Sequence, residues 1–381
     1  MKRSTQRILT THTGSLTRPK KLLEMIEAGN MRARKDDAAF QAEVRSAVAE
    51  VVMLQARTGI DIVNDGEQGR VSYATYVKQR LSGFGGIGTP ITCSDLEAVP
   101  EYRDRVMGSG VRIPQGGCNG PVSYTGQAEL ERDIDNLKQA FVQQSCQEAF
   151  MSAASPGVIA HFLDNEYYPT EDAYLMALAD AMKVEYERLH QAGLLLQIDC
   201  PDLAMARGQK GFAQLTTRQF CEAAELRVEA LNRAVAGIPA EAMRMHLCWG
   251  NYEGPHHHDI ELREIINIVL KARPAGIVLE ACNPRHEHEW QVFEKVKLPP
   301  GKVLIPGVID TVTNFVEHPE LVAQRIERWA KVVGKENVIA GNDCGFASGA
   351  SFMAVHPDIV WMKLQSLVDG ARIASERLWR G

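Results

Sequence analysis

Hydrophobic and polar positions form a repeating pattern from residue 60 onward. Short apolar runs rich in β-branched residues stop at polar or acidic residues, and a stretch with helical spacing follows each run. The runs predict strands at 60–63, 111–114, 158–163, 194–198, 243–247, 276–279, 303–308 and 338–340. Eight buried strands alternating with helices indicate a parallel sheet in an α/β fold. The number eight favours a closed (β/α)8 TIM barrel over an open doubly wound sheet.

Two segments lie outside this repeat. Residues 1–58 are expected to form an N-terminal extension, a turn at Gly14 and Ser15 followed by helices that pack on the barrel. Residues 66–110 contain the Gly-rich piece L-S-G-F-G-G-I-G-T-P, which predicts an insertion or lid loop after the first strand. No linker of domain-separating composition is present, so residues 1–381 are expected to form a single barrel domain.

The composition argues against several classes of function. A formal net charge of −6 and the lack of a long Lys/Arg run disfavour a protein that binds nucleic acid or an anionic membrane. No apolar run approaches the ~20 residues of a membrane span, and the N-terminus lacks the apolar core of a signal peptide. We therefore expect a cytoplasmic protein whose eight scattered cysteines are core residues or ligands. Whether it forms a homo-oligomer stays open.

The run 243–247 ends at the pair His246 and Cys248. Alternation along a strand sends both side chains to one face, where an imidazole and a thiol are two ligands of a zinc site. Two later strand ends offer further ligands, Glu280 and Cys344. Because the carboxyl ends of barrel strands meet at one mouth, the four residues predict a Zn²⁺ site there. Cys282, two residues after Glu280, is the alternative ligand.

Acidic residues follow two other predicted strands. Glu67 lies shortly after the first strand and Asp199 directly after the fourth, where carboxylates can bind a substrate ammonium, hold a metal or act as a base. The turn at Gly14 and Ser15 offers backbone N–H groups that suit a carboxylate or phosphate. These four residues are therefore the candidate substrate-binding residues.

Other chemically suggestive residues have simpler interpretations. The run 256–258 of three histidines suits a solvated loop or a helix start better than a metal site. His286 and His288 open a predicted helix, on which residues two apart diverge around the axis. Asp164 and Glu166 are weaker candidates for function.

A site of one His, two Cys and one Glu favours one kind of reaction. Thiolates lower the Lewis acidity of zinc, so such a site polarises carbonyls poorly, yet it can keep a substrate thiol deprotonated and nucleophilic near pH 7. A displaceable Glu280 would let the substrate sulfur enter. The predicted reaction is S-alkylation of a thiol, with Glu280 and Asp199 as the catalytic residues.

The sequence resembles the catalytic barrel of cobalamin-independent methionine synthases, within a wider group that includes uroporphyrinogen decarboxylase and epoxyalkane:coenzyme M transferase. The resemblance covers almost the whole chain and is carried by six short motifs in order. They are T-T-H-T-G-S at 10–15, D-G-E at 65–67, I-D-C-P at 198–201, H-L-C at 246–248, L-E at 279–280 and N-D-C-G at 342–345.

The resemblance implies roles for the residues already singled out. The family's zinc ligands fall on His246, Cys248, Glu280 and Cys344. Its homocysteine-binding residues fall on Ser15 for the carboxylate, and on Glu67 and Asp199 for the ammonium. The implied partners are a homocysteine-like thiol and a methyl or alkyl donor.

Two positions depart from the family pattern. Cys200 stands where methionine synthases have a carboxylate beside the ammonium site, in I-D-C-P instead of I-D-E-P. Val312 stands where the folate-dependent enzymes have a His that assists the folate leaving group. The second departure, together with resemblance to the family's short forms, leaves the methyl donor open among folate, corrinoid and other donors.

Two alternative functions remain at this stage. An alkyltransferase or lyase that uses a sulfonate thiol would need cations near the metal, for which Arg18 and Arg70 are available. A non-catalytic zinc-binding or thiol-binding protein would not need the acidic residues at the strand ends.

Overall fold

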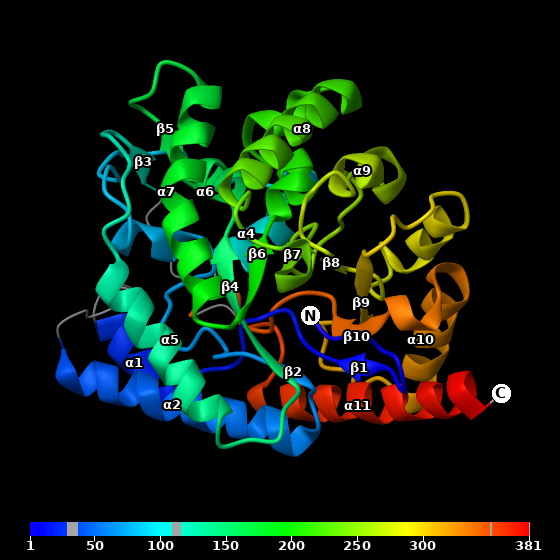
Figure 1. Ribbon diagram of the computed structural model, residues 1–381. Coiled ribbons are helices and arrows are strands. Elements are labelled where there is room, and N and C mark those ends of the chain that lie inside the picture. Colours follow the sequence, from blue (N-terminus) through cyan, green and yellow to red (C-terminus); the bar gives the residue numbers. More distant parts are fainter. Residues whose placement is uncertain (29–36, 109–115, 351–352, 381) are drawn as a thin grey trace.

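The computed structural model describes residues 1–28, 37–108, 116–350 and 353–380. Within these ranges eight strands form one parallel sheet in the order β1-β10-β9-β8-β7-β6-β4-β2. The strands are β1 Leu9–Thr10, β2 Ile62–Val63, β4 Glu148–Ala154, β6 Leu195–Asp199, β7 Met243–Leu247, β8 Gly276–Leu279, β9 Val303–Ile309 and β10 Ile339–Asn342. A parallel bridge between Thr11 and Ile62 joins the two ends of the sheet, so the TIM barrel is confirmed (Figure 1).

Helices surround the barrel (Figure 1). They are α1 Lys20–Ala28, α2 Ala38–Thr58, α3 Ser94–Glu97, α4 Pro100–Gly108, α5 Gln127–Phe141, α6 Pro156–Phe162, α7 Glu171–Gln191, α8 Thr217–Ala234, α9 Leu262–Val269, α10 Pro319–Val333 and α11 Pro357–Arg380. Between β8 and β9 the chain forms a 3-10 helix, η6 Glu287–Glu294. The C-terminal helix α11 packs against β1 and α2, so the two ends of the chain meet on one side of the barrel.

Six of the eight predicted strands are confirmed, as β2, β6, β7, β8, β9 and β10, with ends shifted by up to two residues. The predicted strand 158–163 is wrong, because this segment belongs to helix α6, whose N-cap Ser155 accepts a hydrogen bond from Val158 N. The strand is the preceding segment, β4. Both segments are almost fully buried, and periodicity does not separate a buried strand from a short buried helix. The predicted strand 111–114 lies outside the described residues.

The N-terminal segment belongs to the barrel itself, which corrects its assignment as an extension. Its strand β1 pairs with β10, and the helices α1 and α2 follow as in any other βα unit. A strand of two residues is too short to give a periodic signal. The Gly-rich insertion therefore follows the second barrel strand, not the first.

The Gly-rich insertion is fixed to the barrel by Asp164 and Glu166. Gly88 N donates to Glu166 Oε1 at 2.8 Å, and a Cβ atom at Gly86 would collide with the same carboxylate. Asp164 accepts from Thr89 N of the insertion at 2.6 Å and from Lys210 Nζ at 2.8 Å. These contacts accompany a small two-stranded sheet of β3 Gly117–Cys118 and β5 Asp164–Asn165. Asp164 and Glu166 thus have structural partners, and the Glu166 carboxylate leaves no room for a side chain at Gly86.

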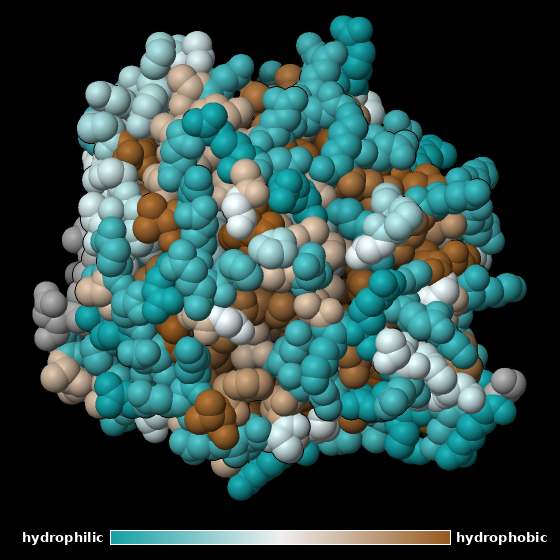
Figure 2. All heavy atoms as spheres, in the orientation of Figure 1, coloured by the Kyte–Doolittle hydropathy of each residue, from teal (hydrophilic) through white to brown (hydrophobic). Residues whose placement is uncertain are grey.

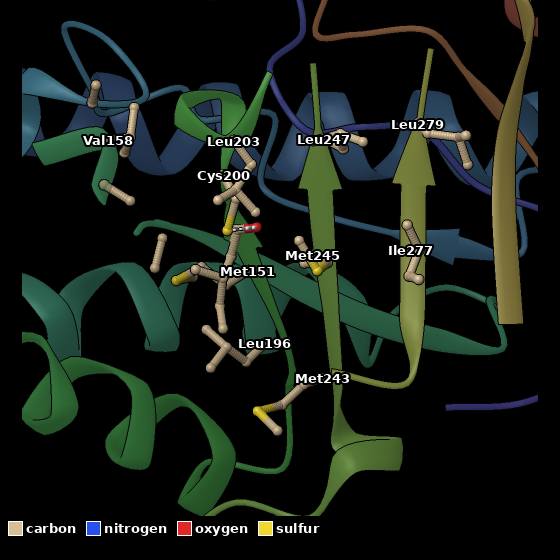
Figure 3. Packing of buried hydrophobic residues seen from close by; sticks show 14 of the residues in the cluster. Met151, Val158, Leu196, Cys200, Leu203, Met243, Met245, Leu247, Ile277 and Leu279 are labelled. Carbon is tan, nitrogen blue, oxygen red and sulfur yellow. Dashed lines mark hydrogen bonds between the residues drawn. The ribbon is translucent and has the colours of Figure 1, made fainter. Parts of the chain in front are cut away.

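The strands separate two apolar layers. Inside the barrel lie apolar side chains from every strand of the sheet except β7, namely Leu9, Ile62, Phe150, Leu195, Val278, Val303, Ile305 and Ile339. Between strands and helices lie the residues of opposite parity, including Met151, Leu196, Met245 and Ile277 (Figure 3). Because Leu195 points inward on β6, alternation directs Gln197 and Asp199 into the barrel, and with them their β7 partners Arg244 and His246.

Hydrophilic side chains cover much of the molecular face seen in Figure 2.

A search of the described helices found none with the length and apolar character needed to cross a bilayer. That residues 1–381 form a single domain stays a prediction.

Candidate functional site

One cavity opens at the carboxyl ends of the barrel strands. It holds about 480 Å³, including the part open to solvent. Its lining includes six of the eight predicted site residues, Ser15, Glu67, Asp199, His246, Cys248 and Cys344. The other lining residues are Thr13, Tyr73, Pro201, Met205, Asn251, Gly345 and Ser348. Segments far apart in the sequence therefore build one site, as the barrel topology requires.

Three potential metal ligands meet in this cavity. His246, Cys248 and Cys344 are all buried, and their ligand atoms lie within 4.8 Å of one another. The two sulfur atoms are 3.5 Å apart. His246 lies on β7, Cys248 directly follows it, and Cys344 follows β10. One nitrogen and two sulfur ligands are a donor set that zinc prefers.

The surroundings of His246 also fit a bound cation. Its Nε2 is buried without a hydrogen-bond partner, whereas its Nδ1 lies 3.5 Å from Asp199 Oδ1. Burial alone would lower the pKa of His246, but Asp199 and Cys248 outweigh burial and raise the pKa to about 10. An unpaired buried nitrogen in an anionic environment, backed by a carboxylate, is the arrangement of a metal-binding histidine.

Glu280 lies at the edge of the cluster. Its Oε1 accepts from the Cys248 thiol at 2.9 Å and from Trp249 N at 2.8 Å, and its Oε2 accepts from Asn283 Nδ2 at 2.8 Å. It is outside the group of three ligands whose atoms lie within 4.8 Å. A carboxylate that other donors hold beside the cluster is suited to be an exchangeable metal ligand.

Cys282 is not part of this group. Strand β8 ends at Leu279, so the alternation that would place Cys282 on the face of Glu280 does not continue that far. Instead Asp343 accepts hydrogen bonds from Ala281 N at 2.8 Å and Cys282 N at 3.1 Å, and turns the chain there.

Glu67 and Asp199 line the same cavity beside the cluster. Glu67 Oε1 accepts from Ser152 Oγ at 2.8 Å, while its buried Oε2 has no partner. Burial, opposed by Arg70 and reinforced by Asp199, raises the pKa of Glu67 to about 7. A substrate ammonium between the two carboxylates would offset both the burial of Glu67 and its repulsion by Asp199.

Gly14 and Ser15 form the wall next to these carboxylates. A Cβ atom at Gly14 would lie 2.8 Å from Glu67 Oε1, so glycine is required for this close approach. Ser15 Oγ accepts from Ala347 N at 3.4 Å, and Ser15 O accepts from Phe346 N at 3.0 Å. These bonds tie the N-terminal turn to the loop after Cys344.

The model of the cobalamin-independent synthase catalytic domain matches residues 160–363, which is more than half of the chain. The chain belongs to the cobalamin-independent synthase family. The matched region contains Asp199, His246, Cys248, Glu280 and Cys344. Glu67 and Ser15 precede it.

Two relatives and two solved structures agree with this family. The methionine synthases of Saccharolobus solfataricus and Thermococcus kodakarensis are 28% and 25% identical to the chain. Each alignment covers 97% of this chain, and 96% and 94% of the relative. A B12-independent methionine synthase from Shewanella sp. W3-18-1, in complex with selenomethionine, has a TM-score of 0.75 at 20% identity, covering 98% of this chain and 100% of that one. A putative vitamin-B12 independent methionine synthase from Listeria monocytogenes has a TM-score of 0.67 at 20% identity, covering 96% and 98%. The two structures show the same fold.

Two of the other histidines, His256 and His286, lie in a separate network of this cobalamin-independent synthase. Asp259 Oδ2 is shared by His256 Nδ1 at 2.9 Å and His286 Nε2 at 3.0 Å. The His286 ring stacks on Trp249, with ring centroids 4.2 Å apart, and Trp249 N in turn binds Glu280. His256 and His286 therefore support the surroundings of Glu280 and lie outside the group of potential metal ligands.

Cys200 does not face the cavity of this family member. Its side chain packs with Leu203 and Met151 in the layer outside the strands (Figure 3). The departure from I-D-E-P therefore changes that outer layer and leaves the lining of the cavity intact.

The sequence pattern missed several residues that shape the site. Gln197 and Arg244 stand two residues before Asp199 and His246. The same alternation that selected the later residues could have found them. Tyr73 and Asn251 lie on loops that line the cavity, and Asp343 binds the loop after β8. Loop residues of this kind have no periodic signal.

Proposed function

We propose that this protein transfers a methyl group to the sulfur of homocysteine to form methionine, with zinc bound by His246, Cys248 and Cys344. One observation carries the proposal: these three residues share a cavity with Glu67 and Asp199. Membership in the cobalamin-independent synthase family supports it, as do the methionine synthases among the relatives.

Each side chain then has a defined task. Glu67 and Asp199 bind the substrate ammonium, and Ser15 with its turn binds the carboxylate. Glu280 would hold the zinc as an exchangeable fourth ligand and would give way to the incoming sulfur. Zinc in this donor set would keep the substrate thiol deprotonated and nucleophilic near pH 7. A sulfur–carbon bond forms as the methyl group leaves its donor.

The sulfonate-thiol alternative has less support. Arg18 Nη2 donates to the carbonyls of Glu67 and Arg70 at 2.8 and 2.9 Å, which fixes it within the wall of the barrel. Arg70 Nη1 donates to Ser152 Oγ at 3.3 Å, and its guanidinium stacks over Tyr76. Neither arginine is among the described residues that line the cavity.

The loop after β9 differs at Val312 from the pattern of the folate-dependent enzymes. Val312 N donates to Asp310 Oδ1 at 3.0 Å, and Thr311 Oγ1 donates to Asn251 Oδ1 at 2.7 Å. The loop after β9 is thus held by its own Asp310 and by Asn251 from the loop after β7, with an apolar side chain where the folate enzymes carry a histidine. The proposal therefore leaves the donor unassigned.

The test is product formation by the zinc-loaded protein. The protein is incubated with homocysteine and one methyl donor at a time: methyltetrahydrofolate, a methylcorrinoid or a methylsulfonium compound. Methionine is measured by mass spectrometry. We expect methionine with at least one donor and none after removal of zinc with a chelator. Alkylation of a sulfonate thiol, but not of homocysteine, would overturn the proposal.

A further inference from the structure

We propose that Gln197 and Arg244, which lie beneath the cavity, position Asp199 for binding of the substrate ammonium. This inference rests on the proposed function, because it assigns Asp199 to homocysteine. Neither residue touches the cavity. They act through Asp199 and are therefore positioning residues.

The register of two strands brings these residues together. On β6 and β7, Gln197 pairs with Arg244 and Asp199 pairs with His246. The four side chains form two adjacent layers inside the barrel. The upper layer faces the cavity, and the lower layer is fully buried, since Gln197 and Arg244 are each 0% exposed.

Arg244 fixes the orientation of the Gln197 amide. Arg244 Nε donates to Gln197 Oε1 at 2.8 Å. Arginine has no acceptor, so the amide oxygen must face Arg244 and the NH₂ group must face the other way. There Gln197 Nε2 donates to Asp199 Oδ1 at 2.9 Å and also to Thr13 O. The amide therefore has one orientation only.

Arg244 itself is held at every nitrogen. Its Nη1 donates to Thr11 Oγ1 at 2.9 Å, and its Nη2 donates to His12 O at 2.6 Å. Its guanidinium lies 3.6 Å from the centroid of the Phe150 ring. These contacts come from strands on different sides of the barrel, so the guanidinium is a fixed point at the centre of the fold.

The chain of bonds determines how Asp199 presents its two oxygens. Oδ1 accepts from Gln197 and faces His246 Nδ1 at 3.5 Å. This leaves Oδ2 for the ammonium of the substrate. A side chain with fixed oxygens binds an ammonium more tightly than a rotating one, because less conformational entropy is lost on binding.

The deciding variant is Gln197→Glu. The new carboxylate can still accept from Arg244 Nε, so the buried pair is kept. It cannot donate to Asp199 or Thr13 O, and it places a second negative group at hydrogen-bond distance from Asp199 Oδ1. We expect Asp199 to rotate away from the new carboxylate, and homocysteine affinity to fall.

Homocysteine binding to zinc-loaded protein is measured by titration calorimetry, which needs no methyl donor. We expect Gln197→Glu to weaken binding about tenfold or more, and Asp199→Asn to weaken it about ten- to a hundredfold. Leu196→Val is the matched control, because Leu196 neighbours Gln197 on β6 but packs in the layer outside the strands, so the change loosens packing without touching the contacts of Arg244. It should lower the melting temperature but leave homocysteine affinity within about twofold of the wild type.

The outcomes separate the two proposals. If wild-type protein does not bind homocysteine, the proposed function fails. If the wild type binds and Gln197→Glu binds equally well at equal zinc content, the positioning role fails. Equal weakening by Leu196→Val and Gln197→Glu would show a general packing effect and also overturn it. Should Gln197→Glu not fold, Arg244→Lys removes the Nε donor instead, and an unchanged affinity in that variant counts against the inference.

Discussion

The sulfur atoms of Cys248 and Cys344 lie 3.5 Å apart, although 96 positions separate the two residues in the chain. The relationship arises because both residues follow strands of one barrel, whose carboxyl ends meet at one mouth. The hydrogen bond with Cys344, together with burial, raises the pKa of Cys248 well above its usual value. A cation bound between two such close, buried thiols would stabilise their deprotonated forms.

Replacing either thiol should therefore remove the metal. We expect Cys248→Ser and Cys344→Ser to retain less than about a tenth of the wild-type zinc, because a hydroxyl is a far poorer ligand. Metal analysis of purified protein measures this. Cys282→Ser is the matched control, because Cys282 lies outside the cluster. Full zinc occupancy in both cluster variants would place the site elsewhere.

Glu280→Ala should separate metal binding from activity. His246, Cys248 and Cys344 remain to hold zinc, so occupancy should fall less than twofold. The rate should fall at least tenfold, because the variant lacks the exchangeable carboxylate at the position that the substrate sulfur enters. Paired metal analysis and rate measurements on one preparation decide this. A variant that loses zinc and rate in proportion would make Glu280 a permanent ligand.

Gly14→Ala tests the close approach of the N-terminal turn to Glu67. The new Cβ atom would lie 2.8 Å from Glu67 Oε1, and Gly14 has φ +157°. We expect the half-saturating homocysteine concentration to rise about tenfold as Glu67 is displaced. Gly211→Ala serves as control, since its Cβ atom would meet no atom within 4 Å. The same change in both variants would rule out a local effect.

Glu67 should also make stability depend on pH. Its pKa is raised from 4.5 to about 7 in the folded protein, chiefly by burial. The folded state therefore binds the extra proton between these values, so this contribution to stability is present below about pH 4.5 and lost as pH rises through 7. Glu67→Gln should raise the melting temperature relative to wild type more at pH 8 than at pH 5. An equal difference at both pH values would contradict the raised pKa.

The sequence predicted the barrel because buried β-branched runs ending in polar residues are a strong and repeated signal. It missed β1, which has only two residues, and it exchanged β4 for α6, since both segments are almost fully buried. His246, Cys248 and Cys344 were predictable from strand parity and position. The position of Cys282 outside their cluster was not predictable, because it depends on Asp343 binding the chain after β8 ends. Contacts between distant loops leave no local pattern to read.

The most direct test of the account is X-ray absorption at the zinc edge of the purified protein, with and without homocysteine. We expect a shell of one nitrogen, two sulfurs and one oxygen, which becomes one nitrogen and three sulfurs at saturating homocysteine. Glu280 would supply the oxygen that is replaced. An unchanged shell with homocysteine, alongside an added sulfur with a sulfonate thiol, would contradict the assignment of homocysteine as the substrate.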